Sequence, residues 1–235
     1  KQFHDNGNIG VEGTVINGQQ EGYWKYYYKK NGQLKKAGSY KNGSLDGFWK
    51  YYNENGQLTH EGNFINDKST GKWKFYREDG QLKREGNLNN NIKTGLWKSY
   101  FRSGELLEQG NYIDDKTSGI WEFYYKNGKL RRTGEYIDGK ENGFWKAYYE
   151  TGELMSEFNY VIYNEQTCGN PPFGTTYGTF FHGHSVSYFK NGQKKREENW
   201  KCGLEDGMFK TFNEEGQLLF IEIYEDGKFL KTIRP

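Results

Sequence analysis

Short aromatic runs alternate with polar positions along most of the chain, and glycine-containing dipeptides separate them. Aromatic runs that flank Asn-Gly, Asp-Gly, Ser-Gly or Thr-Gly predict β-hairpins, because these dipeptides adopt the positive φ that tight two-residue turns require. One such hairpin runs from Gly47 to Phe64 around Asn55-Gly56. No helical period accompanies these runs. The pattern therefore predicts an all-β fold.

The hairpins recur with a period of 24 or 25 residues, which indicates a repeat architecture. A Gly-x-Trp motif opens six copies, at Trp24, Trp49, Trp73, Trp97, Trp121 and Trp145. Two degraded copies follow, with Ser185 and Phe209 in the Trp position. We predict a single array over 1–235, made of an N-terminal half-repeat (1–16), six regular repeats (17–160), an insertion (161–182) and two degraded C-terminal repeats with a cap (183–235).

The turn positions predict the strand register. With Asn55-Gly56 as the two turn residues, Trp49 lies across from Gly62. Glycine weakens a strand, and an aromatic ring laid over it restores packing. We therefore expect each ring to cover the cross-strand glycine of its own hairpin. The first copy has one extra residue before Asn31-Gly32, which predicts a bulge there.

Alternation along the strands assigns two faces. The six tryptophans fall on one face and are predicted to form the structural core. On the other face the register predicts opposite charges in cross-strand pairs, each contributing about 0.2–1 kcal/mol; these pairs are Lys50 with Glu61, Lys74 with Glu85, and Lys146 with Glu157. Stacking about eight hairpins edge to edge gives an open, elongated, twisted single antiparallel sheet.

The Gly-x-Trp…Gly…Leu…Gly-x-Tyr pattern resembles the MORN repeat. It looks most similar to the bacterial variant found in proteins described as antitoxin components of toxin–antitoxin systems. The resemblance covers residues 3–230 except the insertion near 161–180. It implies an open, elongated β-sheet that serves as a scaffold or interaction surface, without catalytic residues. The two degraded copies depart from the pattern, so the C-terminal end is expected to form either a cap or a different surface.

Composition narrows the classes of partner. The 33 Lys and Arg nearly balance the 31 Asp and Glu, for a net charge of +2, which argues against a strongly basic nucleic-acid binder. Aromatic residues make up 18% of the chain, which argues against disorder. No run approaches 18 apolar residues, so we expect no membrane span. The lysines on the face away from the tryptophans could attract phosphate or lipid head groups, but their Glu partners neutralise them, so we expect no nucleic-acid binding and little membrane contact. The chain begins at Lys1, which is compatible with a processed extracytoplasmic protein or a trimmed cytoplasmic one.

An exposed row of tyrosines is predicted on the face away from the tryptophans and is the first candidate binding site; its members are Tyr52, Tyr76, Tyr100, Tyr124 and Tyr148. Tyrosine offers a ring and a hydroxyl at low entropic cost, which suits protein and sugar partners. The alternative is that tyrosine simply fits a half-buried strand position.

The insertion and its neighbourhood contain the other candidates. Cys168 and Cys202 form a disulfide, bind zinc together with His182 and His184, or stay unpaired. A strand over His182-x-His184 would put both rings on one face, but the spacings match no C-x-x-C zinc pattern. The insertion itself is either a binding loop or a segment that covers a sheet edge.

Catalytic motifs are missing from the sequence, including a nucleophile elbow and a P-loop. We therefore expect no enzymatic activity, no catalytic residues, no cofactor and no metal beyond the zinc alternative above. The predicted function is a non-catalytic scaffold that binds a protein partner, in the manner of an antitoxin as the resemblance implies. The alternative is a carbohydrate or cell-wall binding module that uses the tyrosine row. The oligomeric state stays open.

Overall fold

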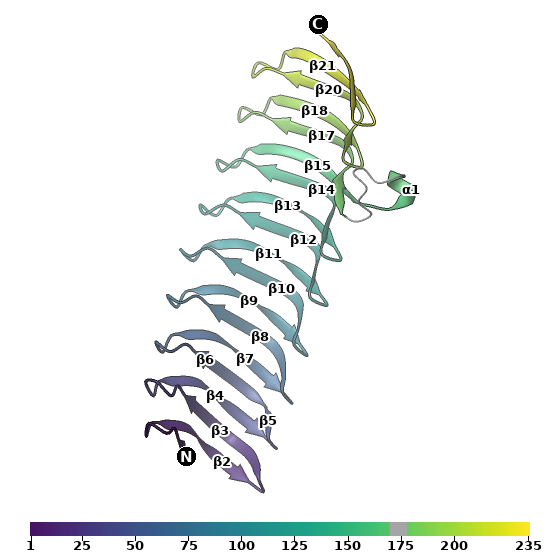
Figure 1. Ribbon diagram of the computed structural model, residues 1–235. Coiled ribbons are helices and arrows are strands. Elements are labelled where there is room, and N and C mark those ends of the chain that lie inside the picture. Colours follow the sequence, from purple (N-terminus) through teal and green to yellow (C-terminus); the bar gives the residue numbers. More distant parts are fainter. Residues whose placement is uncertain (170–177) are drawn as a thin grey trace. The chain divides into compact units, whose positions relative to one another are not determined.

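Antiparallel hairpins account for nearly all of the residues that the computed structural model describes, 1–169 and 178–235 (Figure 1). These fall into two units, residues 1–116 and 117–235, which we describe separately. The all-β, antiparallel, hairpin-repeat prediction is confirmed in each.

Unit 1 contains β1 (Gln2–Phe3), β2 (Ile9–Ile16), β3 (Gln19–Tyr27), β4 (Leu34–Lys41), β5 (Ser44–Leu45), β6 (Gly47–Tyr52), β7 (Leu58–Ile65), β8 (Lys68–Tyr76), β9 (Leu82–Asn89), β10 (Ile92–Tyr100) and β11 (Leu106–Ile113). Unit 2 contains β12 (Lys116–Tyr124), β13 (Leu130–Ile137), β14 (Lys140–Tyr148), β15 (Leu154–Ile162), α1 (Glu165–Cys168), β16 (Thr179–Phe181), β17 (Gly183–Tyr188), β18 (Lys194–Lys201), β19 (Leu204–Glu205), β20 (Gly207–Phe212), β21 (Leu218–Glu225) and β22 (Lys228–Ile233).

The register within each hairpin agrees with the prediction. In unit 1, Trp49 of β6 pairs with Gly62 of β7, and β8 and β9 repeat the arrangement. In unit 2 the degraded copies keep this register, with Ser185 paired to Glu198 and Phe209 to Glu222. The spacing between the Trp position and the turn therefore sets the register even where tryptophan is replaced.

The loop inside each hairpin is wider than the predicted two-residue turn. Between β6 and β7 the Asn53 N–H donates to the Gln57 carbonyl (2.9 Å), and the Gly56 N–H donates to the Asn53 carbonyl (3.0 Å). Gly56 has a φ of 78°, whereas Asn55 does not adopt a positive φ. This is a type I turn followed by a glycine in the left-handed region, which differs from a type I′ turn. The prediction of a two-residue turn at Asn55-Gly56 was wrong.

The two-residue turns lie between hairpins. Asn66-Asp67 links β7 to β8 with φ values of 48° and 65°, and Asn90-Asn91 links β9 to β10 with 51° and 72°. Two consecutive positive φ values are the mark of a type I′ turn, and Asn and Asp tolerate them. The sequence reading missed these turns. Asn66-Asp67 and Asn90-Asn91 contain no glycine, whereas the equivalent turns of the earlier copies, Asn17-Gly18 and Asn42-Gly43, do and also have positive φ at both residues.

The extra residue of the first copy lengthens its loop. The Gly32 N–H donates to the carbonyl of Tyr28, four residues earlier, whereas Gly56 reaches only three residues back. A register shift does occur between Tyr26 and Tyr27, but the same shift recurs in the hairpins without an extra residue. The extra residue therefore does not cause a bulge of its own, contrary to the prediction.

Tryptophan rings fill the space beside a glycine of the preceding hairpin. Between β7 and β8, Glu61 pairs with Lys74 and Asn63 with Thr70, so that Gly62 faces a bulge that contains Trp73. A Cβ atom added to Gly62 would lie 2.2 Å from the Trp73 ring. The Trp73 Nε1–H donates to the Asn63 carbonyl (3.2 Å) and holds the ring in place.

This arrangement corrects the expectation that each ring covers its own cross-strand glycine. The same contact recurs between a glycine and the tryptophan of the following hairpin for Gly13 with Trp24, Gly38 with Trp49, Gly86 with Trp97, and Gly134 with Trp145. In every case the bulge turns the ring toward the neighbouring hairpin. The contact between glycine and tryptophan therefore packs adjacent repeats against each other, in addition to any packing within a single repeat.

The core of each unit is a ribbon of rings on one sheet face, which we call the Trp face. All six tryptophans of the regular repeats are buried. In unit 1, Tyr40 meets Trp49 edge to face with ring centres 5.1 Å apart, and Phe64 meets Trp73 in the same way. Such pairs add about 0.5–1.5 kcal/mol beyond the area that they bury.

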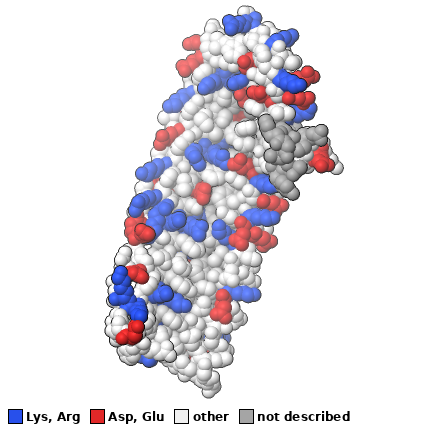
Figure 2. Space-filling view, in the orientation of Figure 1, with Lys and Arg blue, Asp and Glu red and all other residues white. Residues whose placement is uncertain are grey.

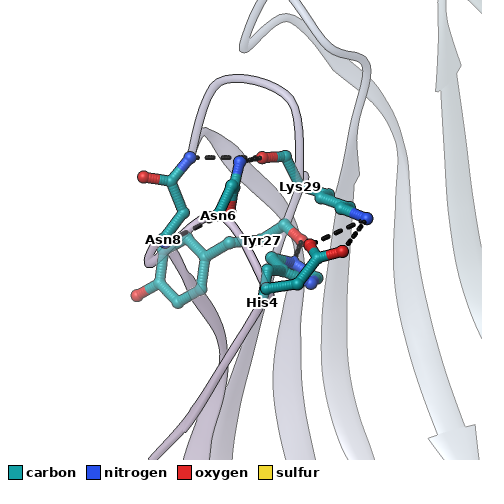
Figure 3. A network of polar contacts seen from close by, with 6 residues as sticks. His4, Asn6, Asn8, Tyr27 and Lys29 are labelled. Carbon is teal, nitrogen blue, oxygen red and sulfur yellow. Dashed lines mark hydrogen bonds and ion pairs between the residues drawn. The ribbon is translucent and has the colours of Figure 1, made fainter.

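Hydrogen bonds also connect successive hairpin loops. The Asn31 side chain donates to the Glu54 carbonyl (2.6 Å). The N-terminal segment repeats this contact, because Asn6 and Asn8 both donate to the Lys29 carbonyl at 2.6 and 3.1 Å (Figure 3). The segment before β2 therefore docks on the first hairpin in the way that each repeat docks on the next.

We expect Gly62→Ala to lower the free energy of unfolding by about 1–3 kcal/mol, because its new Cβ overlaps the Trp73 ring. Gly18→Asn is the control: its Cβ would meet nothing within 4 Å, and Asn91 occupies the equivalent turn position at a φ of 72°. The control should change stability by less than about 0.5 kcal/mol. Urea denaturation measures both, and an unchanged midpoint for Gly62→Ala would contradict the contact.

Candidate interaction surface

The predicted tyrosine row lies on the face opposite the tryptophans, but it is not exposed. Its members are all half-buried: Tyr52, Tyr76, Tyr100, Tyr124 and Tyr148. The Tyr76 hydroxyl donates to Glu61 (2.6 Å) and the Tyr100 hydroxyl to Glu85 (2.9 Å), each glutamate belonging to the preceding hairpin. These hydroxyls are thus engaged inside the sheet, and the description of the row as an exposed stripe was wrong.

Lysines pair with the same glutamates. We call this network of Tyr, Glu and Lys side chains on the face opposite the tryptophans the polar ladder. Lys50 lies 3.8 Å from Glu61, and Lys146 lies 3.1 Å from Glu157, both as the register predicts. Glu85 is the exception, because its ion pair is with Lys72 at 2.9 Å although Lys74 is its cross-strand partner. Each of these glutamates is mostly shielded from solvent, so the ladder neutralises the charge of this face from within.

The pKa shifts agree with this engagement. Burial and the hydrogen bond to Glu85 raise the pKa of Tyr100 to about 12. For Glu85, burial acts to raise the pKa, but the hydrogen bonds from Lys72 and Tyr100 outweigh it, so the pKa of Glu85 lies below its ordinary value. Tyr100 therefore stays a neutral donor and Glu85 a charged acceptor over the physiological range.

The exposed apolar residues of this face lie at another position, directly before the Trp position of most copies. We call them the apolar row; they are Tyr23, Phe48 and Leu96 in unit 1 and Ile120, Phe144 and Met208 in unit 2, between 46% and 60% exposed. Alternation puts them on the face opposite the tryptophans. The sequence reading missed this row, although the variable residue is apolar in five of the six Gly-x-Trp copies, Lys72 being the exception, and in the last degraded copy.

A second set of exposed residues extends this apolar surface. Ile16, Ile65 and Ile113 of unit 1 each directly precede a positive-φ turn, and each is more than half exposed. Ile65 lies two residues beyond Asn63, the partner of Phe48, and so shares its face. Rigid strands that display large apolar side chains in a regular row are typical of interaction sites.

Charges of both signs are interspersed on the face that the space-filling view presents (Figure 2). Lys72 with Glu85, Arg102 with Asp79, and Lys146 with Glu157 are among the close pairs. This mixture agrees with the small net charge of the chain.

Cys168 and Cys202 form a disulfide, with Cα atoms 5.6 Å apart. Cys168 ends α1 in the insertion, and Cys202 begins the two-residue turn between β18 and β19. The bond therefore staples the insertion to a neighbouring inter-hairpin turn and removes both thiols from the zinc alternative. Residues 170–177 of the insertion, with Pro171 and Pro172, lie outside the described residues.

The two histidines are held apart by different partners. His182 lies between β16 and β17, and its Nδ1 is 3.5 Å from the Cys202 sulfur. His184 lies in β17, with its Nδ1 3.3 Å from the Asn199 side-chain oxygen. The expectation that both rings share one face of one strand was wrong, because His182 is not part of a strand. Within residues 1–169 and 178–235, no group of three or more His, Cys, Asp and Glu side chains could hold a metal ion.

The described part of the chain contains no helix with the length and apolar character that a membrane crossing requires.

Comparison with known proteins identifies the repeat. A family model described as MORN repeat variant matches residues 45–66, 69–90, 93–114, 118–138, 141–161 and 181–201, more than half of the chain. No curated protein matches. Solved structures described as crystal structures of TcdB2-TccC3 and of TcdB2-TccC3-Cdc42 are each 12% identical, with a TM-score of 0.23. The match covers 95% of this chain, which spans 14% of the length of those chains.

Tyr100→Phe should lower the free energy of unfolding at pH 7 by about 1.5 kcal/mol, because it removes a hydrogen bond to a charged group. Glu85 has a lowered pKa, so its contribution is present above its ordinary pKa of 4.5 and is lost as the pH falls through the lowered value. The difference between variant and wild type should therefore shrink in acid. Denaturation at pH 7 and pH 3 tests this, with the exposed Tyr23→Phe as control; an equal loss at both pH values would contradict the assignment.

Proposed function

The chain belongs to the MORN repeat variant family, and from this premise we propose that it is a non-catalytic scaffold that binds a protein partner through the apolar row. The observation that carries the proposal is the exposure of large apolar side chains at one position of most hairpins, Phe48 and Leu96 among them; the hairpin between these two has Lys72 there. Exposing such side chains to water is unfavourable, and a partner that covers them gains about 25 cal/mol for each Å² of apolar area.

The apolar row has the properties of a rigid binding platform. Strand hydrogen bonds fix the backbone beneath Phe48, and the Trp49 side chain next to it is fully buried. A preformed surface loses little conformational entropy on binding, so more of the contact energy appears as affinity. Lys50 and Lys146 lie near Phe48 and Phe144, with the ammonium groups 5.9 and 5.6 Å from the ring centres, and supply a polar border.

We further propose that binding neutralises the partner, as in an antitoxin. A platform that covers a partner's active surface needs no chemistry of its own, and this agrees with the use of Glu61 and Glu85 as acceptors within the polar ladder. These glutamates recur with the repeat, which supports a structural role for them. Carbohydrate binding by the tyrosine row has less support, because the Tyr76 and Tyr100 hydroxyls already donate to glutamates.

The proposal predicts that Phe48→Ser combined with Leu96→Ser weakens binding of the natural partner at least tenfold without loss of fold. The partner is identified by affinity purification from lysate of the native organism, and its Kd is then measured with purified components. Val15→Ser is the control, because Val15 is 57% exposed but lies on the Trp face.

Loss of binding in the double variant alone supports the apolar row. Equal binding by all three proteins, or retention of cell-wall polysaccharide in place of a protein, would overturn the proposal. The antitoxin role requires in addition that expression of the partner alone arrests growth and that coexpression of this chain restores it.

A further inference from the structure

The Trp face of unit 1 carries cations that have no ion-pair partner in the described part of the chain. The Lys36 ammonium lies 4.5 Å from the centre of the Tyr26 ring, and the Arg84 guanidinium lies 4.7 Å from that of Phe75. Lys93 lies 4.5 Å from the Tyr112 ring and 5.2 Å from that of Trp97. All three side chains are half-buried, and aromatic rings hold them in place.

Unit 2 contains the equivalent cation with a carboxylate beside it. Arg132 stands two periods after Arg84 and lies over Phe123 and Trp145 in the same way. Its guanidinium forms an ion pair with Glu141. A carboxylate therefore fits beside an arginine at this point of the Trp face.

Unit 1 has the charge reversed at that point. Lys93 occupies the position of Glu141, so Arg84 faces a second cation where Arg132 faces an anion. Burial and the Arg84 charge both lower the pKa of Lys93, while Asp115 and Glu108 act in the opposite direction. In addition, the buried Nε of Arg84 has no hydrogen-bond acceptor among the described protein groups. Arg84 and Lys93 thus lack the carboxylate that Glu141 supplies to Arg132 in unit 2.

From this contrast we propose that the Trp face of unit 1 binds an extended acidic segment of a protein partner, with one carboxylate between Arg84 and Lys93 and another at Lys36. Lys36 and Arg84 stand at equivalent positions of β4 and β9, four strands apart, or roughly 19 Å at the usual strand spacing. About six extended residues span that distance. The half-buried rings of Tyr26 and Phe75 offer contacts to side chains between the carboxylates.

The shape of the surface near Lys36 suits such a segment. A pocket of about 320 Å³ is lined by Lys36, Tyr26 and Val11, together with Phe3 and His4 of the N-terminal segment. His60 lies at the position between Lys36 and Arg84, stacked on Tyr51 with ring centres 4.3 Å apart. Glu108 acts on Lys93 from the same face, and within the described residues the two form no ion pair.

The test uses a fluorescein-labelled peptide of about ten residues that alternates Glu and Tyr, and a matched peptide with Gln in place of Glu. Fluorescence anisotropy at 50 mM NaCl gives the Kd for each. Wild type should bind the Glu peptide at least tenfold more tightly than the Gln peptide. Arg84→Gln with Lys93→Gln should weaken the Glu peptide at least tenfold, whereas Lys74→Gln with Lys98→Gln, which removes the same charge from the opposite face, should change its Kd less than twofold.

Lys93→Glu separates binding from a structural role. It recreates in unit 1 the ion pair of Arg132 with Glu141, so it should raise the Tm and also abolish binding of the Glu peptide. A raised Tm with unchanged peptide affinity would overturn the proposal. Equal weakening by both double variants, equal affinity for both peptides, or tighter binding to anionic phospholipid vesicles than to the Glu peptide would overturn it as well.

This surface is independent of the apolar row. Phe48→Ser with Leu96→Ser should leave the Kd of the Glu peptide within twofold of wild type, because both residues lie on the opposite face. Failure of the protein-partner proposal therefore does not decide the acidic-segment proposal, and the reverse also holds.

Discussion

The contact between a tryptophan ring and the glycine of the preceding hairpin is the constraint on which each unit depends. Trp73 occupies the space that a side chain at Gly62 would need, and the backbone bulge around Trp73 brings its ring there. A single hairpin has nothing to cover such a ring, so burial of the core requires a neighbour. The stability of a hairpin is thus shared with the next one, and the glycine and the tryptophan of adjacent repeats act as one unit.

The same geometry divides the work between the two faces. Rings and their glycines occupy the Trp face, while Lys50, Glu61 and Tyr76 satisfy one another on the opposite face across adjacent hairpins. Side chains that take part in neither the Trp–Gly packing nor the polar ladder remain available to contact a partner. On the opposite face these are Phe48 and its equivalents. On the Trp face of unit 1 they are cations that lie over aromatic rings and form no ion pair within the described residues.

Much of the fold could be predicted from the sequence because a two-residue alternation and a 24-residue period leave one consistent register. The glycine that each ring covers could not be predicted from the sequence. Alternation assigns Trp73 to a face of the sheet but does not say which of the two adjacent hairpins its ring contacts. Asn66-Asp67 escaped notice because a type I′ turn without glycine has a weak signature. The exposure of Tyr76 was misjudged because its partner, Glu61, lies in another repeat. The disulfide between Cys168 and Cys202 was one of three alternatives, since sequence spacing alone does not bring two thiols together.

A pair of double-mutant cycles tests the central contact most directly. One cycle combines Gly86→Ala with Trp97→Val, the ring of the following hairpin, and the other combines Gly86→Ala with Trp73→Val, the cross-strand partner. Our account predicts that the smaller side chain at 97 relieves the clash, with a coupling of about 1–3 kcal/mol, and that the changes at 86 and 73 add within about 0.5 kcal/mol. Coupling to Trp73 with additivity at Trp97 would contradict it and would mean that each hairpin completes its own core.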